Sequence, residues 1–314
     1  MSVYTELNHQ HIEAILADYA LGTLKSFSGI AAGIENSNFF IHTTNGKRYV
    51  LTIFERLSGN ELPYFMRLMK HLAATGLKSP DVQVRKDLSL LFDFETEEGM
   101  KQGCIVSCLT GETLDDLNEA QLRSSGETLA ALHLAGASFP EKRENPTGFD
   151  WLKNHIEHMQ ADVEKTYGAD ALNLLNDELN FQHQQSMVKL PSGVIHGDLF
   201  CDNILFEGDE VSGVIDFYYA HDSAYMMDVA IAINAQAIVL GADDQKRMKV
   251  FLEGYTSKRT LNFEEENALV ALLRLGALRF WVSRLYDALY PRGGAMVKTH
   301  DPEEYRRKLA FHRG

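Results

Sequence analysis

The spacing of apolar residues along the chain changes from short runs near the amino terminus to long helical stripes further on. Four runs are rich in aromatic and β-branched residues, as is typical of strands, and occupy residues 38–43, 48–54, 89–94 and 103–109. Asn45-Gly46 separates the first two runs, and this dipeptide is a strong signal for a tight hairpin turn. Residues 61–75 instead carry apolar side chains at helical spacing and stop before Gly76, which predicts a helix. The first third of the chain is therefore expected to be a small sheet with helices.

Helical periodicity dominates the rest of the chain. The predicted helices have apolar residues three or four positions apart and cover residues 117–137, 151–167, 171–188, 224–240 and 264–290. The exception is a short hairpin, in which residues 204–206 and 211–215 flank a polar turn. We therefore expect a first lobe of residues 1–109 and a second, mostly helical lobe of residues 110–314, packed as parts of one molecule.

Composition and charge exclude several classes of protein. The 314 residues are 45% hydrophobic and 24% charged, as in ordinary globular chains. The net charge of −14 repels phosphate backbones and anionic lipid headgroups, so nucleic acid and membrane surfaces are poor partners. The most apolar stretch, residues 229–240, is interrupted by Asn234 and Gln236 and is shorter than the roughly 18 residues that a membrane span needs. No signal peptide is evident at the amino terminus, so we expect a cytoplasmic protein.

The most informative motif combines His196-Gly-Asp198 with Asn203 and, further on, Asp216. A carboxylate at Asp198 can face the hydroxyl of a substrate. The amide oxygen of Asn203 and the carboxylate of Asp216 are oxygen ligands of the kind that hold a divalent cation beside a triphosphate. The predicted hairpin separates these two ligands and can direct both toward one point.

This motif resembles the catalytic loop of the small-molecule branch of the protein-kinase-like superfamily, which includes aminoglycoside phosphotransferases and choline kinases. The resemblance implies an α+β fold with a small antiparallel-sheet N-lobe and a larger, mostly helical C-lobe. It also implies ATP and Mg²⁺, with Asp198 as the acid/base and Asn203 and Asp216 as metal ligands. We count His196 with Asp198 in the catalytic set, and expect it to orient the loop and not to act as a base or metal ligand. Asp228 resembles the aspartate that braces the catalytic loop in this branch.

The resemblance implies a nucleotide site in the first lobe. Gly33, Asn36, Ser37 and Asn38 belong to the expected phosphate loop, and Thr52 is the β-strand side chain. Ser107 and Leu109 lie at the connection between the lobes, and Leu205 is expected below the adenine. Thr52 departs from the pattern, because related kinases have Lys or Arg at this point of the strand. Either the Thr52 hydroxyl binds an oxygen while Mg²⁺ and another residue supply the charge, or the nucleotide is held loosely.

Four segments together resemble the homoserine kinases of the aminoglycoside-phosphotransferase type, over about residues 4–309. They are Gly33–Phe40, Tyr49–Glu55, His196–Asn203 and Leu278–Arg284. This resemblance implies phosphorylation of L-homoserine, a small-molecule substrate, in threonine biosynthesis. Homoserine has a carboxylate and an ammonium group, so we expect contacts from Arg279, Arg284, Tyr218 and Asp222. Arg279 is the best candidate for a fork on the carboxylate, and Arg284 points about 140° away from it around the helix.

Other functions stay open on the sequence alone. The same reaction on choline, ethanolamine, methylthioribose or an aminoglycoside needs a differently charged pocket. A catalytically silent nucleotide-binding protein is suggested by the missing strand lysine at Thr52. A metallohydrolase that uses His196, Asp198, His221 and Asp222 would leave Asn203 without a role. The oligomeric state and the choice between ATP and GTP have no signal in the sequence.

Overall fold

The computed structural model describes residues 5–30, 36–57, 59–97, 99–185, 189–291 and 300–314. These residues divide into two compact units. The first unit is Met1–Gly111 with Ser212–Tyr218, and the second is Glu112–Val211 with Tyr219–Gly314. The chain thus returns to the first unit for seven residues, a segment that the expected boundary at residue 109 assigns to the second lobe.

The first unit is built on a five-stranded antiparallel sheet with the order β1-β2-β3-β5-β4. Its strands are β1 (Leu24–Gly29), β2 (Asn36–Thr43), β3 (Arg48–Phe54), β4 (Phe92–Thr96) and β5 (Gly99–Ser107). The predicted hairpin around Asn45-Gly46 is confirmed, since β2 pairs with β3 directly across this turn.

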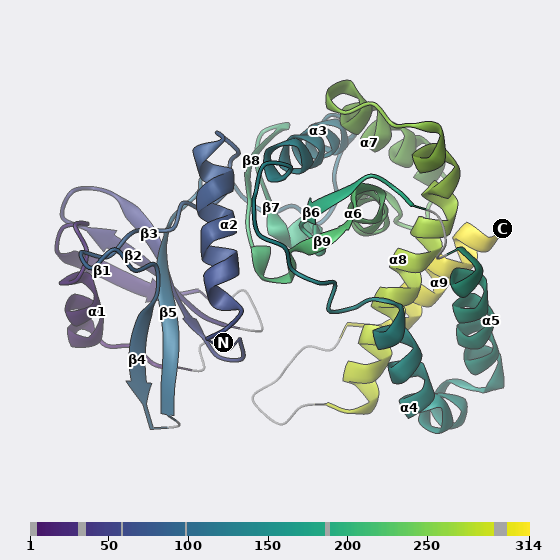
Figure 1. The fold of residues 1–314 in the computed structure, drawn as a ribbon, viewed down its shortest axis with the longest axis horizontal. Helices are drawn as coiled ribbons and strands as arrows, with labels where there is room; N and C mark the ends of the chain where they lie inside the picture. Colours follow the sequence, from purple (N-terminus) through teal and green to yellow (C-terminus); the bar gives the residue numbers. More distant parts are fainter. Residues whose placement is uncertain (1–4, 31–35, 58, 98, 186–188, 292–299) are drawn as a thin grey trace. The chain divides into compact units, whose positions relative to one another are not determined.

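The two faces of this sheet have different partners (Figure 1). Phe39, Leu51 and Ile105 lie on the face that forms a buried core with α1 (His9–Leu16). Asn38, Thr52 and Cys104 are paired across neighbouring strands and therefore share the opposite face. Helix α2 (Leu62–Ala74) belongs to that second side, because its side chains meet the returning segment that also contacts this face. We call this second face, which carries Asn38 and Thr52, the polar face of the sheet.

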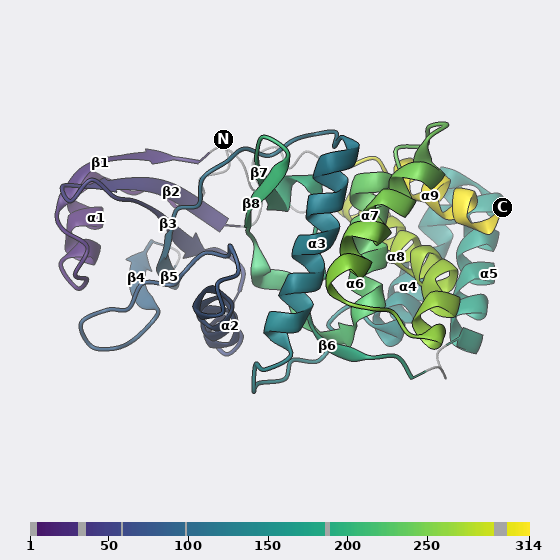
Figure 2. The ribbon, with the colours of Figure 1, turned by 90° about the horizontal axis from the view of Figure 1, so that it is seen from above.

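The second unit is mostly helical, as expected. Its helices are α3 (Glu119–Gly136), α4 (Phe149–Tyr167), α5 (Ala169–Gln185), α6 (Tyr225–Ala232), α7 (Asp244–Lys258), α8 (Phe263–Leu289) and α9 (Pro302–Arg313). Figure 2 shows α3 beside α7, and a pair of glycines explains how closely they approach. A Cβ at Gly126 would collide with the Phe251 carbonyl, and one at Gly254 would collide with the Arg123 carbonyl. Two short sheets, β6 (Ser192–Ile195) with β9 (His221–Ala224) and β7 (Ile204–Glu207) with β8 (Glu210–Val214), complete the fold.

The helix predicted over residues 224–240 is present over residues 225–237, but its last part is of another type. The α-helix α6 ends at Ala232 and continues as a π-helix, η3 (Ile233–Ala237), before the chain becomes extended at Ile238. A second predicted helix, 171–188, ends in the structure at Gln185, and residues 186–188 lie outside the described residues. Among the described residues, no helix is both long and apolar enough to cross a membrane.

Candidate active site

The His196–Asn203 segment lies in the second unit, directly after β6, and contains the short 3-10 helix η1 (Cys201–Asn203). Gly197 has a φ of +77°, a region that favours glycine. A Cβ at this position would also lie 3.0 Å from the carbonyl oxygen of Tyr219. The glycine of the His-Gly-Asp motif is therefore required both by the turn and by the lack of space beside it.

Asp228 on α6 holds the beginning of this segment. Its buried carboxylate accepts hydrogen bonds from the backbone N–H groups of His196 (2.7 Å) and Gly197 (2.9 Å). The Nε2 atom of His133, on α3, lies 3.0 Å from the same carboxylate. Burial alone would raise the pKa of Asp228, but the contact with His133 and the backbone donors outweigh it and keep the pKa below its usual value. An ionised Asp228 on α6 thus binds the backbone of the loop, in agreement with its expected role.

Asn203 orients Asp198. Its Nδ2 donates to the backbone oxygen of Asp198 at 2.8 Å and lies 3.3 Å from the carboxylate oxygen Oδ2. Because Nδ2 takes both of these contacts, Oδ1 of Asn203 is left without a hydrogen-bond partner among the described residues and can serve as a cation ligand. His196 is fully buried, and its Nδ1 accepts a hydrogen bond of 3.3 Å from the Asp198 N–H, so it orients the loop.

Arg279 of α8 reaches the same segment. Its Nη1 donates to the Gly197 carbonyl oxygen at 2.8 Å, and its Nε donates to Oγ1 of Thr147 at 2.9 Å. Burial lowers the pKa of Arg279, and the nearby charge of Asp198 opposes that shift. The fork that the sequence predicts is therefore partly used by the protein, and Nη2 is the guanidinium nitrogen without a partner among the described residues.

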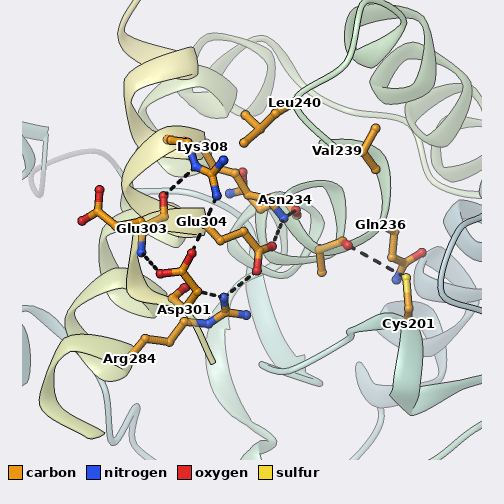
Figure 3. A network of polar contacts seen from close by, with 12 residues as sticks. Cys201, Asn234, Gln236, Val239, Leu240, Arg284, Asp301, Glu303, Glu304 and Lys308 are labelled. Atoms are coloured by element: carbon orange, nitrogen blue, oxygen red, sulfur yellow. Dashed lines mark hydrogen bonds and ion pairs between the residues drawn. The ribbon is translucent and has the colours of Figure 1, made fainter. Parts of the chain in front are cut away.

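The other two charged substrate candidates have partners within the second unit. Arg284 pairs with Glu304 of α9 at 2.6 Å, as Figure 3 shows. Asp222 pairs with Lys142 at 2.6 Å and accepts a hydrogen bond from the backbone N–H of Arg143 at 2.9 Å. A substrate that contacts either side chain has to share it with these partners.

Asp216 lies in the returning segment of the first unit. It is exposed and has a φ of +65°, which is uncommon for a residue other than glycine and is typical of functional sites. Two residues later, the ring of Tyr218 packs edge-on against Phe54 (centroids 5.1 Å apart) and Phe65 (5.9 Å). These contacts fix the backbone that carries Asp216.

The hydroxyl of Tyr218 extends the polar face of the sheet. It is hydrogen-bonded with Thr52 and with Cys104, and burial raises its pKa well above the usual value. Thr52 in turn donates from Oγ1 to Oδ1 of Asn38 at 2.7 Å. The position at which related kinases carry a cation is therefore occupied by a neutral network that joins β2, β3, β5 and the segment of Asp216.

The remaining nucleotide candidates are distributed over both units. Ser37 faces the core, where its Oγ donates to Oε1 of Glu55 at 2.6 Å, while Asn36 starts β2 as a buried residue. At the end of β5, the Oγ of Ser107 accepts a hydrogen bond of 2.9 Å from the Asp81 N–H. This bond fixes the start of the connection that contains Leu109. Leu205 lies on β7 of the second unit, and Gly33 lies outside the described residues.

The structure thus gathers His196, Asp198, Asn203 and Arg279 in the second unit, and Asn38, Thr52 and Tyr218 with the segment of Asp216 in the first. Sequence reasoning missed the contribution of Thr147, which binds Arg279. No motif marks Thr147, and only an arginine on an apolar helix stripe indicated that some partner exists.

A carboxylate and an amide on one catalytic loop, together with a sheet and a helical unit, define the class of kinase-like phosphotransferases. A family model described as the phosphotransferase enzyme family matches residues 26–257, and the chain belongs to this family. A homoserine kinase of Methylobacillus flagellatus is 40% identical over 312 residues, covering 98% of this chain and 94% of that protein. A homoserine kinase of Agrobacterium fabrum is 41% identical over 318 residues, covering 100% and 96%. The solved structure of an amicoumacin kinase in complex with AMP-PNP and Ca²⁺ has a TM-score of 0.72 at 16% identity, covering 98% of this chain and 92% of that one, and therefore shows the same fold.

Proposed function

We propose that the protein transfers the γ-phosphoryl group of ATP to the side-chain hydroxyl of L-homoserine, as a step of threonine biosynthesis. The observation that carries the proposal is the Asp198–Asn203 pair, held on a braced loop in a chain of the phosphotransferase family. Relatives that match almost the whole chain at 40% and 41% identity are homoserine kinases, which supports the choice of substrate. A reaction between ATP and a free amino acid also favours a cytoplasmic protein with a small-molecule partner.

Asp198 is the proposed catalytic residue. Its carboxylate is positioned by the amide of Asn203 and can accept the proton of the substrate hydroxyl as the oxygen attacks phosphorus. In the balanced step, the bond from the substrate oxygen to the γ-phosphorus forms and the bond from the γ-phosphorus to the β,γ-bridging oxygen breaks. The hydroxyl proton goes to Asp198, and ADP leaves.

Two side chains, one in each unit, carry oxygen atoms of the kind that bind a divalent cation. Oδ1 of Asn203 is an uncommitted amide oxygen among the described residues, and Asp216 is an exposed carboxylate on a strained turn. Oxygen ligands of this type suit Mg²⁺, which supplies neutralisation of phosphate charge when it is bound. We propose these two residues as its ligands. The polar face of the first unit, with Asn38 and Thr52, is the proposed nucleotide side, together with Gly33, Asn36 and Ser37 of the phosphate loop, Ser107 and Leu109 at the connection, and Leu205.

Arg279 is the proposed reader of the homoserine carboxylate. It is 6% exposed and lies close enough to Asp198 for the two charges to interact. Its Nε and one N–H of Nη1 are used within the protein, so both N–H groups of Nη2 and the second N–H of Nη1 remain for the substrate carboxylate. Arg284, Asp222 and Tyr218 stay secondary candidates, because each already has the protein partners described above.

A coupled assay of ADP release tests the proposal. Wild-type protein with saturating Mg·ATP is compared across homoserine, choline, ethanolamine, methylthioribose and kanamycin, with the Asp198→Asn variant as control. Homoserine should give the highest kcat/KM, and the variant should lower kcat by on the order of 10²-fold or more while it still binds ATP. A preference for another alcohol would replace the substrate, and nucleotide binding without turnover of any of them would favour the silent binding protein.

A further inference from the structure

The π-helix η3 ends in four consecutive carbonyl oxygens that have no partner further along their own helix. Each of the four receives a side chain from elsewhere in the second unit. Asn234 O accepts from Lys308 of α9 (2.7 Å), Ala235 O from the thiol of Cys201 (3.9 Å), and Gln236 O and Ala237 O from Arg247 of α7 (2.9 and 3.1 Å). Figure 3 shows Lys308 approaching Asn234, with Cys201 beside Gln236. Lysine and arginine are the residues that a helix carboxyl terminus favours, so η3 is fixed from two helices at once.

Gln236 connects this fixed helix end to the catalytic loop. Its side chain is 1% exposed, and its Nε2 donates to the backbone oxygen of Leu199 at 2.9 Å. Its Oε1 accepts a hydrogen bond of 2.6 Å from the Oγ of Ser125 on α3, which determines the orientation of the amide. Leu199 is the residue after Asp198 and is fully buried, so loss of the Gln236 donor removes a buried hydrogen bond from its carbonyl oxygen.

The backbone around Asp198 is therefore held on both sides. Asp228 binds the N–H groups of the two preceding residues, Arg279 binds the Gly197 oxygen, and Gln236 binds the Leu199 oxygen. A carboxylate that takes a proton during phosphoryl transfer has to be placed to a fraction of an ångström, and such precision depends on the residues behind it. The sequence did not predict the hydrogen bond by which Gln236 fixes the backbone after Asp198.

We propose that Gln236 is a positioning residue for Asp198, and that the π-helix exists to present it. The inference rests on the proposed kinase activity and adds the group that fixes the far side of the catalytic loop. Gln236 touches neither substrate nor Asp198 itself, so its loss should slow the chemical step and leave substrate binding nearly unchanged.

Steady-state kinetics of the Gln236→Met variant test this inference. Methionine keeps the length of the side chain and removes both hydrogen bonds. We expect kcat to fall between about tenfold and a hundredfold, with KM for ATP and for homoserine within about threefold of wild type. The matched control is Gln182→Met on α5. Gln182 is 4% exposed and its Nε2 also donates to a backbone oxygen at 2.9 Å, that of Ala271, but it has no hydrogen bond to the catalytic loop. Its kcat should stay within about twofold of wild type.

A merely structural role for Gln236 predicts that both variants lose thermal stability and activity in parallel, and this result would overturn the inference. An unchanged kcat in a folded Gln236→Met protein would overturn it as well. If the methionine variant does not fold, Gln236→Glu decides, because glutamate still accepts the Ser125 hydrogen bond and loses only the donor to Leu199. The proposed function fails separately, when wild-type protein does not phosphorylate homoserine. The same comparison is then made with whichever alcohol the screen identifies.

Discussion

A half-buried histidine near the carboxyl terminus should make the second unit sensitive to mild acid. The Nε2 atom of His312, on α9, lies 2.7 Å from Oδ1 of Asn234 in η3. Burial, aided by the charge of the neighbouring Lys308, lowers the pKa of His312 from 6.5 to about 4. The folded protein thus holds the neutral form of this imidazole at pH values where an unfolded chain would already be protonated.

The sign and size of the effect follow from this pKa. Between about pH 6.5 and pH 4 the unfolded state binds a proton that the folded state does not, so the free energy of unfolding falls as the pH falls. pH 5 is about 1.5 units below the pKa of this histidine in the unfolded chain. Its protonation there lowers the free energy of unfolding by about 2 kcal/mol. The side chain is partly accessible, and solvent screening reduces the expected loss to about 1 to 2 kcal/mol.

Urea unfolding at pH 7.5 and pH 5.0 measures this loss. Both tryptophans, Trp151 and Trp281, lie in α4 and α8, so their fluorescence reports the second unit. The His312→Gln variant retains an N–H donor for Asn234 and cannot titrate, while His9→Gln changes an exposed histidine and serves as control. Wild type and the control should lose about 1 to 2 kcal/mol more than His312→Gln on the shift to pH 5.0. Equal losses in all three proteins would refute the argument, because the acid sensitivity would then come from other groups.

Three further variants test the site. Asp216→Ala should abolish Mg²⁺-dependent ATP binding in calorimetry, since the cation would lose its charged ligand, and undiminished affinity would remove Asp216 from the metal site. Arg279→Ala should lower kcat/KM for homoserine by roughly 10²-fold and should reduce the preference for homoserine over 3-aminopropanol, which lacks the carboxylate; a preference as strong as in wild type would mean that another residue reads this group. Tyr218→Phe keeps the ring contacts and removes the hydroxyl bonded with Thr52, so KM for ATP should rise by about tenfold while KM for homoserine stays constant; a change confined to homoserine would instead place Tyr218 at the substrate.

Features that depend on local sequence were predictable, and those that depend on distant partners were not. The Asn45-Gly46 hairpin and the helix near residues 61–75 follow from turn chemistry and apolar spacing, and both appear in the structure with small shifts at their ends. The helix expected over residues 224–240 is found over 225–237, but its change to a π-helix and its early end were not predicted, because spacing shows which face is apolar and not which carbonyl groups are bound by side chains elsewhere. Lys308, for example, binds the carbonyl oxygen of Asn234, which lies 74 residues earlier in the sequence.

The same distinction holds for the site. The motif around Asp198 and the brace at Asp228 followed from the sequence and its resemblance, and in the structure the Asp228 carboxylate binds the loop backbone as expected. Asn234 and Gln236 were noticed only as polar interruptions of an apolar stretch, yet polar side chains at buried positions of a helix are a signal that partners exist. The partner of Gln236, Leu199, is 37 residues earlier, and nothing in the sequence connects the two.

The seven residues 212–218, which return to the first unit, have a consequence for how the chain is made and divided. A fragment that stops at Gly111 would lack Tyr218, so Phe54 and Phe65 would lose an aromatic neighbour and Cys104 and Thr52 a hydrogen-bond partner. During synthesis the first unit is therefore unable to complete its polar face until the ribosome has passed Tyr218, by which time the catalytic loop has also been made. Expression of the first unit by itself therefore requires residues 212–218 to be supplied. They can be joined by a linker after residue 111 or added as a separate peptide.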